Sequence, residues 1–270
     1  NDVRRSVQSG QLDTAAVPGS DIPLTIDAAL QQYAEELMGG KRGSVVAIEP
    51  ETGEVLAMVS APTFDPDLLT GTGRGAVYDS LAHHPGKPLF NRALRATYRP
   101  GSIFKMVQGL IALDEGIIAR STRIPCNRNI INCHGAHSFD NLSEAIMHSC
   151  NPYFHEVMKR FVERQEVSSR FEDAAIGLGR WTGRIKGFGF GTDLGGHLPG
   201  TRAGLGPDTT YYDGVYGRRS WAYSTIYSIS IGEGELLVTP LQIANVAAII
   251  ANRGWYRTPH AVRDVGGRGK

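Results

Sequence analysis

The sequence predicts a mixed α/β (α+β) fold, and three features of the chain carry that prediction. Two apolar runs, residues 43–50 and 53–60, are joined across a short polar link and predict an antiparallel β-hairpin with one buried face. Residues 102–178 show mainly helical patterns. With 270 residues, 41% of them hydrophobic, the chain can bury a substantial core, so we expect one large globular domain.

The first third of the chain contributes a leader, a helix, the hairpin and a connection. Residues 1–21 are polar and contain glycine and proline, which indicates a linker or the remnant of an N-terminal pedestal domain. The domain proper is expected over residues 22–270. Asp27 can cap a helix over residues 28–38. Residues 62–100 follow the hairpin, show little periodicity and are expected to form a long connection.

Three helices are expected in the middle of the chain. Residues 102–113 are apolar nearly all round, which predicts a buried helix that ends at Asp114-Glu115-Gly116. A shorter helix is expected from Leu142 to His148. An amphipathic helix then begins near Pro152, which suits the first helical position, with Asn151 as the N-cap.

The remaining stretches predict a loop and a last helix. Residues 187–206 are rich in glycine, but they lack the G-x-G-x-x-G order of a nucleotide-binding loop, so we reject that interpretation. A helix is expected over residues 240–252, with Gly254 after its end. The formal net charge of +1 gives no reason to expect nucleic acid as a partner. No run approaches 18 apolar residues, and no signal peptide is visible.

Ser102 and Lys105 place a possible nucleophile and a possible base one helical turn apart. A serine hydroxyl attacks poorly at neutral pH unless an adjacent base takes its proton, and positions i and i+3 share a helix face. In a buried helix Lys105 loses solvent, which lowers the pKa of its ammonium and favours the neutral base. The alternative is a helix-capping serine beside a lysine that extends to solvent.

A second element comes at Ser149-Cys150-Asn151. These residues fall in a tight link between two expected helices, where side chains can point into a cleft. The segment from Tyr98 to Lys105, read together with this link, resembles the transpeptidase domain of class B penicillin-binding proteins, most like the elongation-type members. The resemblance covers about residues 22–262. Further segments similar to the family are Leu24-Thr25-Ile26-Asp27, Phe90-Asn91-Arg92-Ala93, Leu198-Pro199-Gly200, Ser230-Ile231-Gly232-Glu233-Gly234 and Val238-Thr239-Pro240-Leu241-Gln242.

The family's third motif, Lys-Thr-Gly or Lys-Ser-Gly, is absent from these 270 residues. We therefore expect a fragment that stops before the strand carrying that motif, rather than a degenerate member of the family. The resemblance implies a penicillin-binding protein and serine β-lactamase-like fold, with an antiparallel sheet, an all-helical part and the active site between them. The C-terminal strands of the sheet are expected to be missing.

The resemblance also implies a mechanism of acyl transfer. Ser102 attacks the penultimate D-alanine carbonyl of a peptidoglycan stem peptide, and Lys105 takes the serine proton. Ser149 relays that proton to the leaving amine, and Asn151 binds the substrate amide. β-Lactams resemble the D-Ala-D-Ala end and are expected to acylate Ser102, and no cofactor is required for this chemistry.

Three alternatives share part of the pattern. A serine β-lactamase needs a base for deacylation, and no Glu-x-x-Leu-Asn element is present to supply it. A penicillin-sensing receptor domain acylates without cross-linking, but the residues from Gly232 to Gln242 look like a synthase. A non-catalytic structural module does not explain why all four candidate catalytic residues are retained.

The chain's three cysteines, Cys126, Cys133 and Cys150, flank this region. One interpretation is a Cys126–Cys133 disulfide with Cys150 free. The other is a structural Zn²⁺ held by Cys126, Cys133, His137 and Cys150, a closed Cys₃His set. His134 is an alternative fourth ligand, although its adjacency to Cys133 makes tetrahedral geometry harder. Some elongation-type relatives carry zinc in this region, and the resemblance therefore favours the metal.

Location and partners follow from the resemblance alone. It implies the periplasmic, extracytoplasmic face of the inner membrane, held by an anchor outside this fragment. The implied partners are peptidoglycan stem peptides, β-lactam antibiotics, a glycosyltransferase and other proteins of the elongation complex.

Overall fold

The two predicted apolar runs form a β-hairpin in the structure, a computed structural model that describes residues 19, 21–194 and 198–263. Strands β1 (Gly43–Ile48) and β2 (Val55–Ala61) pair antiparallel, with Val45 opposite Val59 and a register shift between Ala47 and Ile48. The alternate residues of β2 from Val55 to Ala61 are buried. The expected linker over residues 1–21 lies almost wholly outside the described residues.

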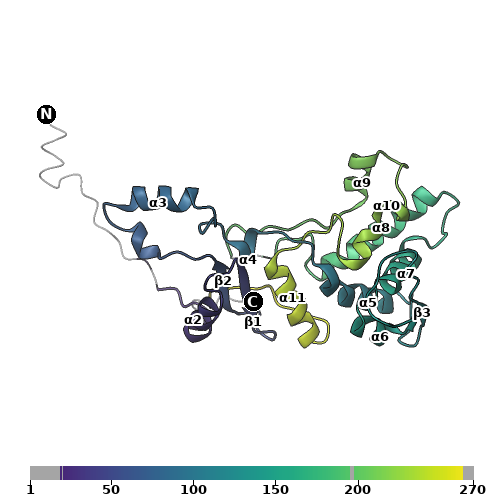
Figure 1. Cartoon of the computed structure of the whole chain (residues 1–270), viewed down its shortest axis with the longest axis horizontal. Helices are drawn as coiled ribbons and strands as arrows, with labels where there is room; N and C mark the ends of the chain where they lie inside the picture. The colour runs from purple at the N-terminus through teal and green to yellow at the C-terminus, as the bar shows by residue number, and fades with distance from the viewer. Residues whose placement is uncertain (1–18, 20, 195–197, 264–270) are drawn as a thin grey trace, which may run out of the picture.

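Three helices pack around this hairpin (Figure 1). Helix α2 (Ala28–Leu37) packs on β2, and Asp27 caps it as predicted, because the Asp27 side chain accepts a hydrogen bond from Leu30 N at 3.0 Å. The short helix α4 (Arg92–Arg95) and the last helix α11 (Pro240–Ala251) pack on β1. A small core forms where they meet, from Val55, Leu94, Leu194, Leu198 and Leu241.

Residues 62–100 contain more structure than the expected connection. They include a 3₁₀ turn, η1 (Pro66–Leu69), and a ten-residue helix, α3 (Arg74–His83), which extends away from the sheet in Figure 1. The expected long connection with little periodicity thus contains a regular helix, α3, that was not predicted. None of its side chains is buried, so no apolar face marks the helix in the sequence.

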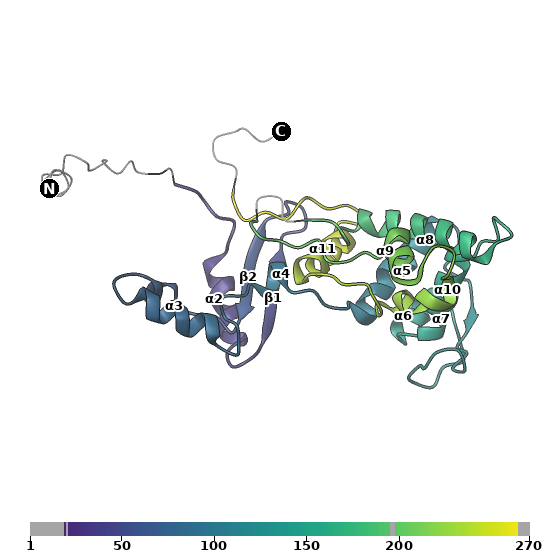
Figure 2. The same ribbon diagram turned by 90° about the horizontal axis from the view of Figure 1, so that it is seen from above.

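The other half of the chain is helical, as predicted, and lies beyond α11 from the sheet (Figure 2). A 3₁₀ turn, η2 (Gly101–Ile103), leads into α5 (Phe104–Asp114), so the helix expected from Ser102 starts as a 3₁₀ turn. A two-stranded ribbon of β3 (Ile124–Pro125) and β4 (Phe139–Asp140) follows. The remaining elements are α6 (Leu142–Met147), α7 (Asn151–Val162), α8 (Arg170–Gly187), α9 (Thr209–Tyr216), α10 (Tyr223–Ile226) and η3 (Tyr227–Ile231).

Helix α5 lies at the centre of the helical half. Phe104, Val107 and Ile111 are buried in a core shared with α7 and α8. Gln108 is also fully buried, and its Oε1 accepts a 2.8 Å hydrogen bond from the Trp181 indole on α8. Because buried polar groups need partners, this bond fixes α8 against α5. The helix that carries the candidate base is thus held on several sides.

The described part of the glycine-rich stretch is a loop that is hydrogen-bonded to α11. The Gln242 side chain is fully buried, and its Nε2 donates hydrogen bonds to the backbone oxygens of Gly189, Thr192 and Ala203. One amide therefore joins three points of the loop to the helix. Within the described part of the chain, no helix is long and apolar enough to cross a membrane.

Candidate active site

Ser102 lies in the 3₁₀ turn that begins the buried helix, with its side chain exposed. The preceding Gly101 has φ +59°, and its N–H donates a 2.8 Å hydrogen bond to Gly232 O. Gly232 itself has φ +77°, and a Cβ there would lie 2.1 Å from Gly101 O. Only glycine allows this close approach. The Ser230–Gly234 segment is similar to the family in sequence, and no role was predicted for it. In the structure it holds in place the turn that carries Ser102.

Lys105 is 2% exposed and is surrounded by oxygen atoms. Its Nζ lies 3.1 Å from Ser102 Oγ, 2.8 Å from Ser149 Oγ, 2.7 Å from Ser149 O and 2.6 Å from Asn151 Oδ1. The Ser149 hydroxyl in turn donates to Ser102 Oγ at 2.9 Å. The four residues predicted from the motifs thus form one connected hydrogen-bond network.

Burial lowers the pKa of the Lys105 ammonium below its ordinary value of 10.5. The nearby Cys133 and Cys150 side chains act on this pKa in the opposite direction, but desolvation is the larger cause. A larger fraction of Lys105 is therefore neutral at a given pH than for a lysine in water. A neutral amine 3.1 Å from a serine hydroxyl can accept its proton.

Ser149 and Asn151 lie at the junction of α6 and α7. Ser149 has φ +51°, a conformation uncommon for non-glycine residues and concentrated at functional sites. The expected role of Asn151 as N-cap was wrong, because Cys150 holds that position and Asn151 is the first residue of α7. Its side chain instead joins Lys105 to the loop before α6, since Asn151 Nδ2 donates to Asn132 O at 2.7 Å.

The structure brings together all four predicted metal ligands. The ligand atoms of Cys126, Cys133, His137 and Cys150 lie within 4.8 Å of one another. His137 Nε2 is 3.5 Å from Cys133 Sγ and 4.0 Å from Cys126 Sγ. All three cysteines are free thiols, so the alternative Cys126–Cys133 disulfide is not formed. His134 faces the cluster only with its backbone oxygen, 3.0 Å from His137 Nε2, and its ring is not part of it.

The donor set fits a tetrahedral Zn²⁺. Usual Zn–S and Zn–N bonds at tetrahedral angles place sulfur and nitrogen ligands about 3.6 Å apart, close to the separations found here. His137 Nδ1 lies 2.8 Å from Asp140 Oδ2, and both side chains are almost fully buried, so the carboxylate holds the ring with Nε2 toward the thiols. Asp140 also contacts His148 Nδ1 at 3.2 Å. A carboxylate behind a histidine is the usual outer support of a zinc site.

The sequence matches the family described as "Penicillin binding protein transpeptidase domain" over residues 43–267. The chain belongs to this family. It is 33% identical over 257 residues to the peptidoglycan D,D-transpeptidase MrdA of Acinetobacter baumannii. The aligned region covers 91% of this chain and 36% of that relative. It is 32% identical over 269 residues to the peptidoglycan D,D-transpeptidase PbpA of Mycolicibacterium smegmatis, covering 92% of the chain and 50% of the relative.

A solved structure of Pseudomonas aeruginosa PBP2 in complex with WCK 5153 superimposes with a TM-score of 0.81 at 30% identity, covering 96% of this chain and 55% of that one. This confirms the predicted penicillin-binding protein fold. The chain spans about a third to a half of the length of these two curated relatives. In the described part of this transpeptidase domain, β1 and β2 form one two-stranded sheet, and β3 and β4 form a separate two-stranded ribbon.

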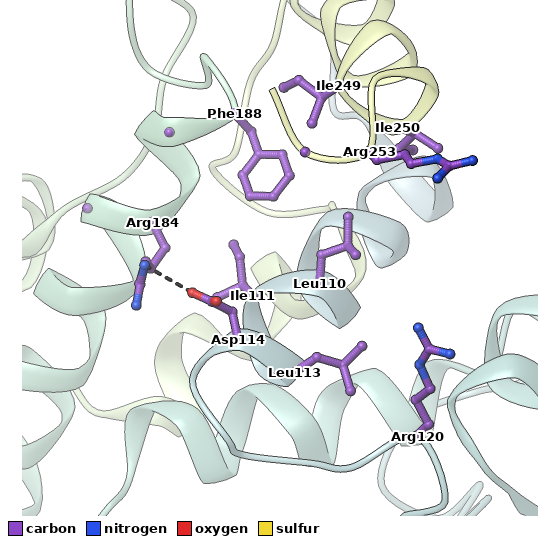
Figure 3. A pocket seen from close by; sticks show the side chains of 13 residues that line it. Leu110, Ile111, Leu113, Asp114, Arg120, Arg184, Phe188, Ile249, Ile250 and Arg253 are labelled. Atoms are coloured by element: carbon purple, nitrogen blue, oxygen red, sulfur yellow. Dashed lines mark ion pairs between the residues drawn. The ribbon is translucent and has the colours of Figure 1, made fainter. Parts of the chain in front are cut away.

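A large cavity in the described part of the transpeptidase domain lies away from Ser102. It has a volume of about 840 Å³ and opens between α5, α8 and α11 (Figure 3). Leu110, Phe188 and Ile250 contribute apolar walls, and an ion pair of 3.2 Å joins Asp114 to Arg184 at one side. None of the four catalytic candidates lines it. Size alone therefore does not mark the active site here.

Proposed function

We propose that this chain belongs to an elongation-type peptidoglycan D,D-transpeptidase that cross-links stem peptides through a serine acyl-enzyme. The observation that carries the proposal is the network joining Ser102 Oγ, Lys105 Nζ, Ser149 Oγ and Asn151 Oδ1. The curated relatives named as D,D-transpeptidases support the reaction class.

In this proposal each side chain has one role in acyl transfer. Ser102 Oγ bonds to the carbonyl carbon of the penultimate D-alanine while its proton passes to neutral Lys105. The Ser149 hydroxyl, hydrogen-bonded to both, returns a proton to the departing amine of the terminal D-alanine. The amine of a second strand then attacks the ester carbonyl carbon and forms the new amide as the bond to Ser102 Oγ breaks, and the proton of the amine passes through Lys105 to Ser102 Oγ. Asn151 orients Lys105 and hydrogen-bonds the substrate amide.

The N-terminal end of α5 assists the nucleophile. Helix N-termini favour negative charge, so the Ser102 backbone N–H is placed to stabilise the oxygen of the tetrahedral intermediate. A second donor is expected from the strand with the Lys-Ser/Thr-Gly motif, which this sequence does not contain. Because losing one oxyanion donor costs about 10²- to 10³-fold in rate, the chain alone is expected to acylate slowly.

The proposal includes a structural Zn²⁺ at Cys126, Cys133, His137 and Cys150. When bound, the ion would cross-link the irregular loop before α6 to the start of α7. Cys133 follows Asn132, whose backbone oxygen binds Asn151, and Cys150 precedes Asn151 directly. Holding these two segments together keeps Asn151 at Lys105. The residues therefore position a catalytic group rather than act on the substrate.

Location and partners are also part of the proposal. The proposed location is the periplasmic, extracytoplasmic face of the inner membrane, because a peptidoglycan transpeptidase acts where peptidoglycan lies. A structure of Helicobacter pylori PBP2 in complex with MreC, 26% identical with a TM-score of 0.75, supports an elongation-complex partner. A glycosyltransferase that supplies new strands is the second expected partner, beside stem peptides and β-lactams.

One assay separates the transpeptidase from the two related functions. The protein is given a donor ester that ends in D-Ala-D-lactate, with and without a D-amino acid as acceptor. A transpeptidase yields the aminolysis product, and Ser102→Ala yields none. A β-lactamase would instead hydrolyse benzylpenicillin with turnover, and a sensing domain would be acylated by penicillin without forming the cross-linked product.

A further inference from the structure

The cavity between α5, α8 and α11 is large enough for a ligand of its own. Its volume of about 840 Å³ falls within the range of cavities that enclose drug-sized ligands. Leu110, which lines it, comes eight residues after Ser102, a helical rise of about 12 Å along α5. A small ligand can therefore occupy this cavity without touching the nucleophile.

Apolar side chains form the walls of the cavity, and two of them are left exposed. Leu110 on α5 and Ile250 on α11 are each 43% exposed, although both helices contribute to the core. Ile111 and Ile249 also line the cavity and are each 3% exposed, so they form its floor. The ring of Phe188 projects into the space between these walls in Figure 3. Because apolar surface in contact with water is unfavourable, these walls favour an apolar ligand.

The wall contributed by α8 carries no side chain at two positions. Gly183 and Gly187 both line the cavity, and a Cβ added at either would meet no heavy atom within 4 Å. These two positions therefore face open space. The cavity keeps its volume because both residues are glycine, and a larger residue at either position would fill part of it.

The charged side chains give the cavity a positive rim. Arg184 pairs with Asp114 at 3.2 Å and with Glu115 at 2.5 Å, so its charge is compensated. Arg120 and Arg253 also line the cavity, and neither forms an ion pair with any residue in the described part of the chain. Figure 3 shows them on the side opposite the Asp114–Arg184 pair. Two uncompensated guanidinium groups beside apolar walls suit a ligand that carries an anionic group.

We propose that this cavity binds a small anionic ligand with an aromatic or branched apolar body. The body lies against Leu110, Phe188 and Ile250, and the anionic group meets Arg120 and Arg253. A protein partner fits less well, because a stable protein interface buries about 800 Å² on each side. Among the described residues that line the cavity, only Leu110 and Ile250 are large apolar side chains with high exposure. The inference does not depend on the proposed function, since no catalytic candidate lines the cavity.

Two fluorescent probes test the preference for an anion. They are anilinonaphthalene sulfonate and phenylnaphthylamine, which has the same ring system without the sulfonate, and fluorescence titration gives the Kd of each. We expect one bound probe per chain and about tenfold tighter binding of the sulfonate, the ratio given by one charge-assisted hydrogen bond. The double variant Arg120→Gln, Arg253→Gln should reduce that ratio to about twofold or less and leave the neutral probe unaffected. Arg74→Gln, which changes an exposed arginine on α3, is the matched control and should keep the ratio.

A pair of glycine variants tests where the probes bind. Gly183→Leu places a side chain in the cavity and should weaken both probes at least about tenfold, because it takes the volume that the rings need. Gly179→Leu, one helical turn earlier, also meets open space but does not line the cavity, so both affinities should stay as in the parent protein. Leucine is a better helix former than glycine, so neither variant should destabilise α8, and thermal unfolding checks this.

Three results would overturn the site. Equal affinities of the two probes for the parent protein would remove the preference for an anion, as would a double arginine variant that still prefers the sulfonate. Gly183→Leu that binds both probes as tightly as Gly179→Leu would show that the probes bind elsewhere. Binding of neither probe would reject a small-ligand site and leave the cavity to a protein partner.

Discussion

Lys105 Nζ lies closer to Asn151 Oδ1, at 2.6 Å, than to the serine it is to deprotonate, at 3.1 Å. The amide thus anchors the amine, and the short link between α6 and α7 sets its position. We expect Asn151→Ala to slow acylation by penicillin about 2- to 10-fold, since a hydrogen bond between neutral groups contributes about 0.5–1.5 kcal/mol. Stopped-flow acylation kinetics would measure this. A variant as fast as the parent protein would show that the contact does not matter for catalysis.

Lys105 should act as a base whose pKa is lowered by burial. Because only the neutral amine accepts a proton, the acylation rate should rise with pH and level off above a midpoint below 10.5. Lys105→Arg keeps a cation but removes the base, and should lower the rate about 10²- to 10⁴-fold. A rate–pH profile between pH 5 and 10 measures both effects. An arginine variant with an unchanged rate and profile would exclude Lys105 as the base.

The cysteine cluster should contain zinc. Protein purified without added metal is expected to hold close to one Zn²⁺ per chain by elemental analysis. Cys126→Ser and His137→Gln should lose the metal, and each kcal/mol lost should lower the melting temperature by roughly 2–4 °C. His134→Gln, which changes a ring outside the cluster, is the matched control and should keep the zinc. Metal-free protein with a Cys126–Cys133 disulfide would reject the site.

Helices α7 and α8 should tolerate no added atom at Gly177. A Cβ there would lie 2.2 Å from Val162 O, a backbone atom that cannot move aside. We expect Gly177→Ala to cost at least about 2 kcal/mol of unfolding free energy, because overpacking of a tight contact is destabilising. Gly179→Ala, two residues along and with no heavy atom within 4 Å, should stabilise by about 0.5–1 kcal/mol. Thermal unfolding of both variants measures this difference in stability. Equal melting temperatures would contradict the close contact between Gly177 and Val162 O.

The four candidate catalytic residues could be selected from the sequence because their signals are local. Ser102 and Lys105 are one turn apart, and Ser149 and Asn151 occupy one short link, so sequence spacing already places each pair. Tertiary packing brings the two pairs together, and this could not be derived from spacing within the sequence. The same packing explains why the prediction of Asn151 as an N-cap was wrong. A residue with N-cap chemistry was predicted to cap its helix, but the buried Lys105 takes its side-chain oxygen.

Other features of the structure could not be predicted, because they leave no pattern in the amino-acid sequence. Helix α3 has no buried face, so hydrophobic periodicity could not reveal it. The role of Gly232 depends on Gly101, which is distant in the sequence, and appears only when the chain is folded. The four sulfur and nitrogen ligands were predicted as a set from their chemistry and from the family resemblance, and their mutual distances came from the structure.

The central claim is that Ser102 is the nucleophile, and intact-protein mass spectrometry after exposure to benzylpenicillin tests it most directly. The account predicts a mass increase of one penicilloyl group, located at Ser102 by peptide mapping and absent from Ser102→Ala. Long incubation is needed, since acylation of this chain is expected to be slow. An adduct at another residue, or one that persists in Ser102→Ala, would contradict the account.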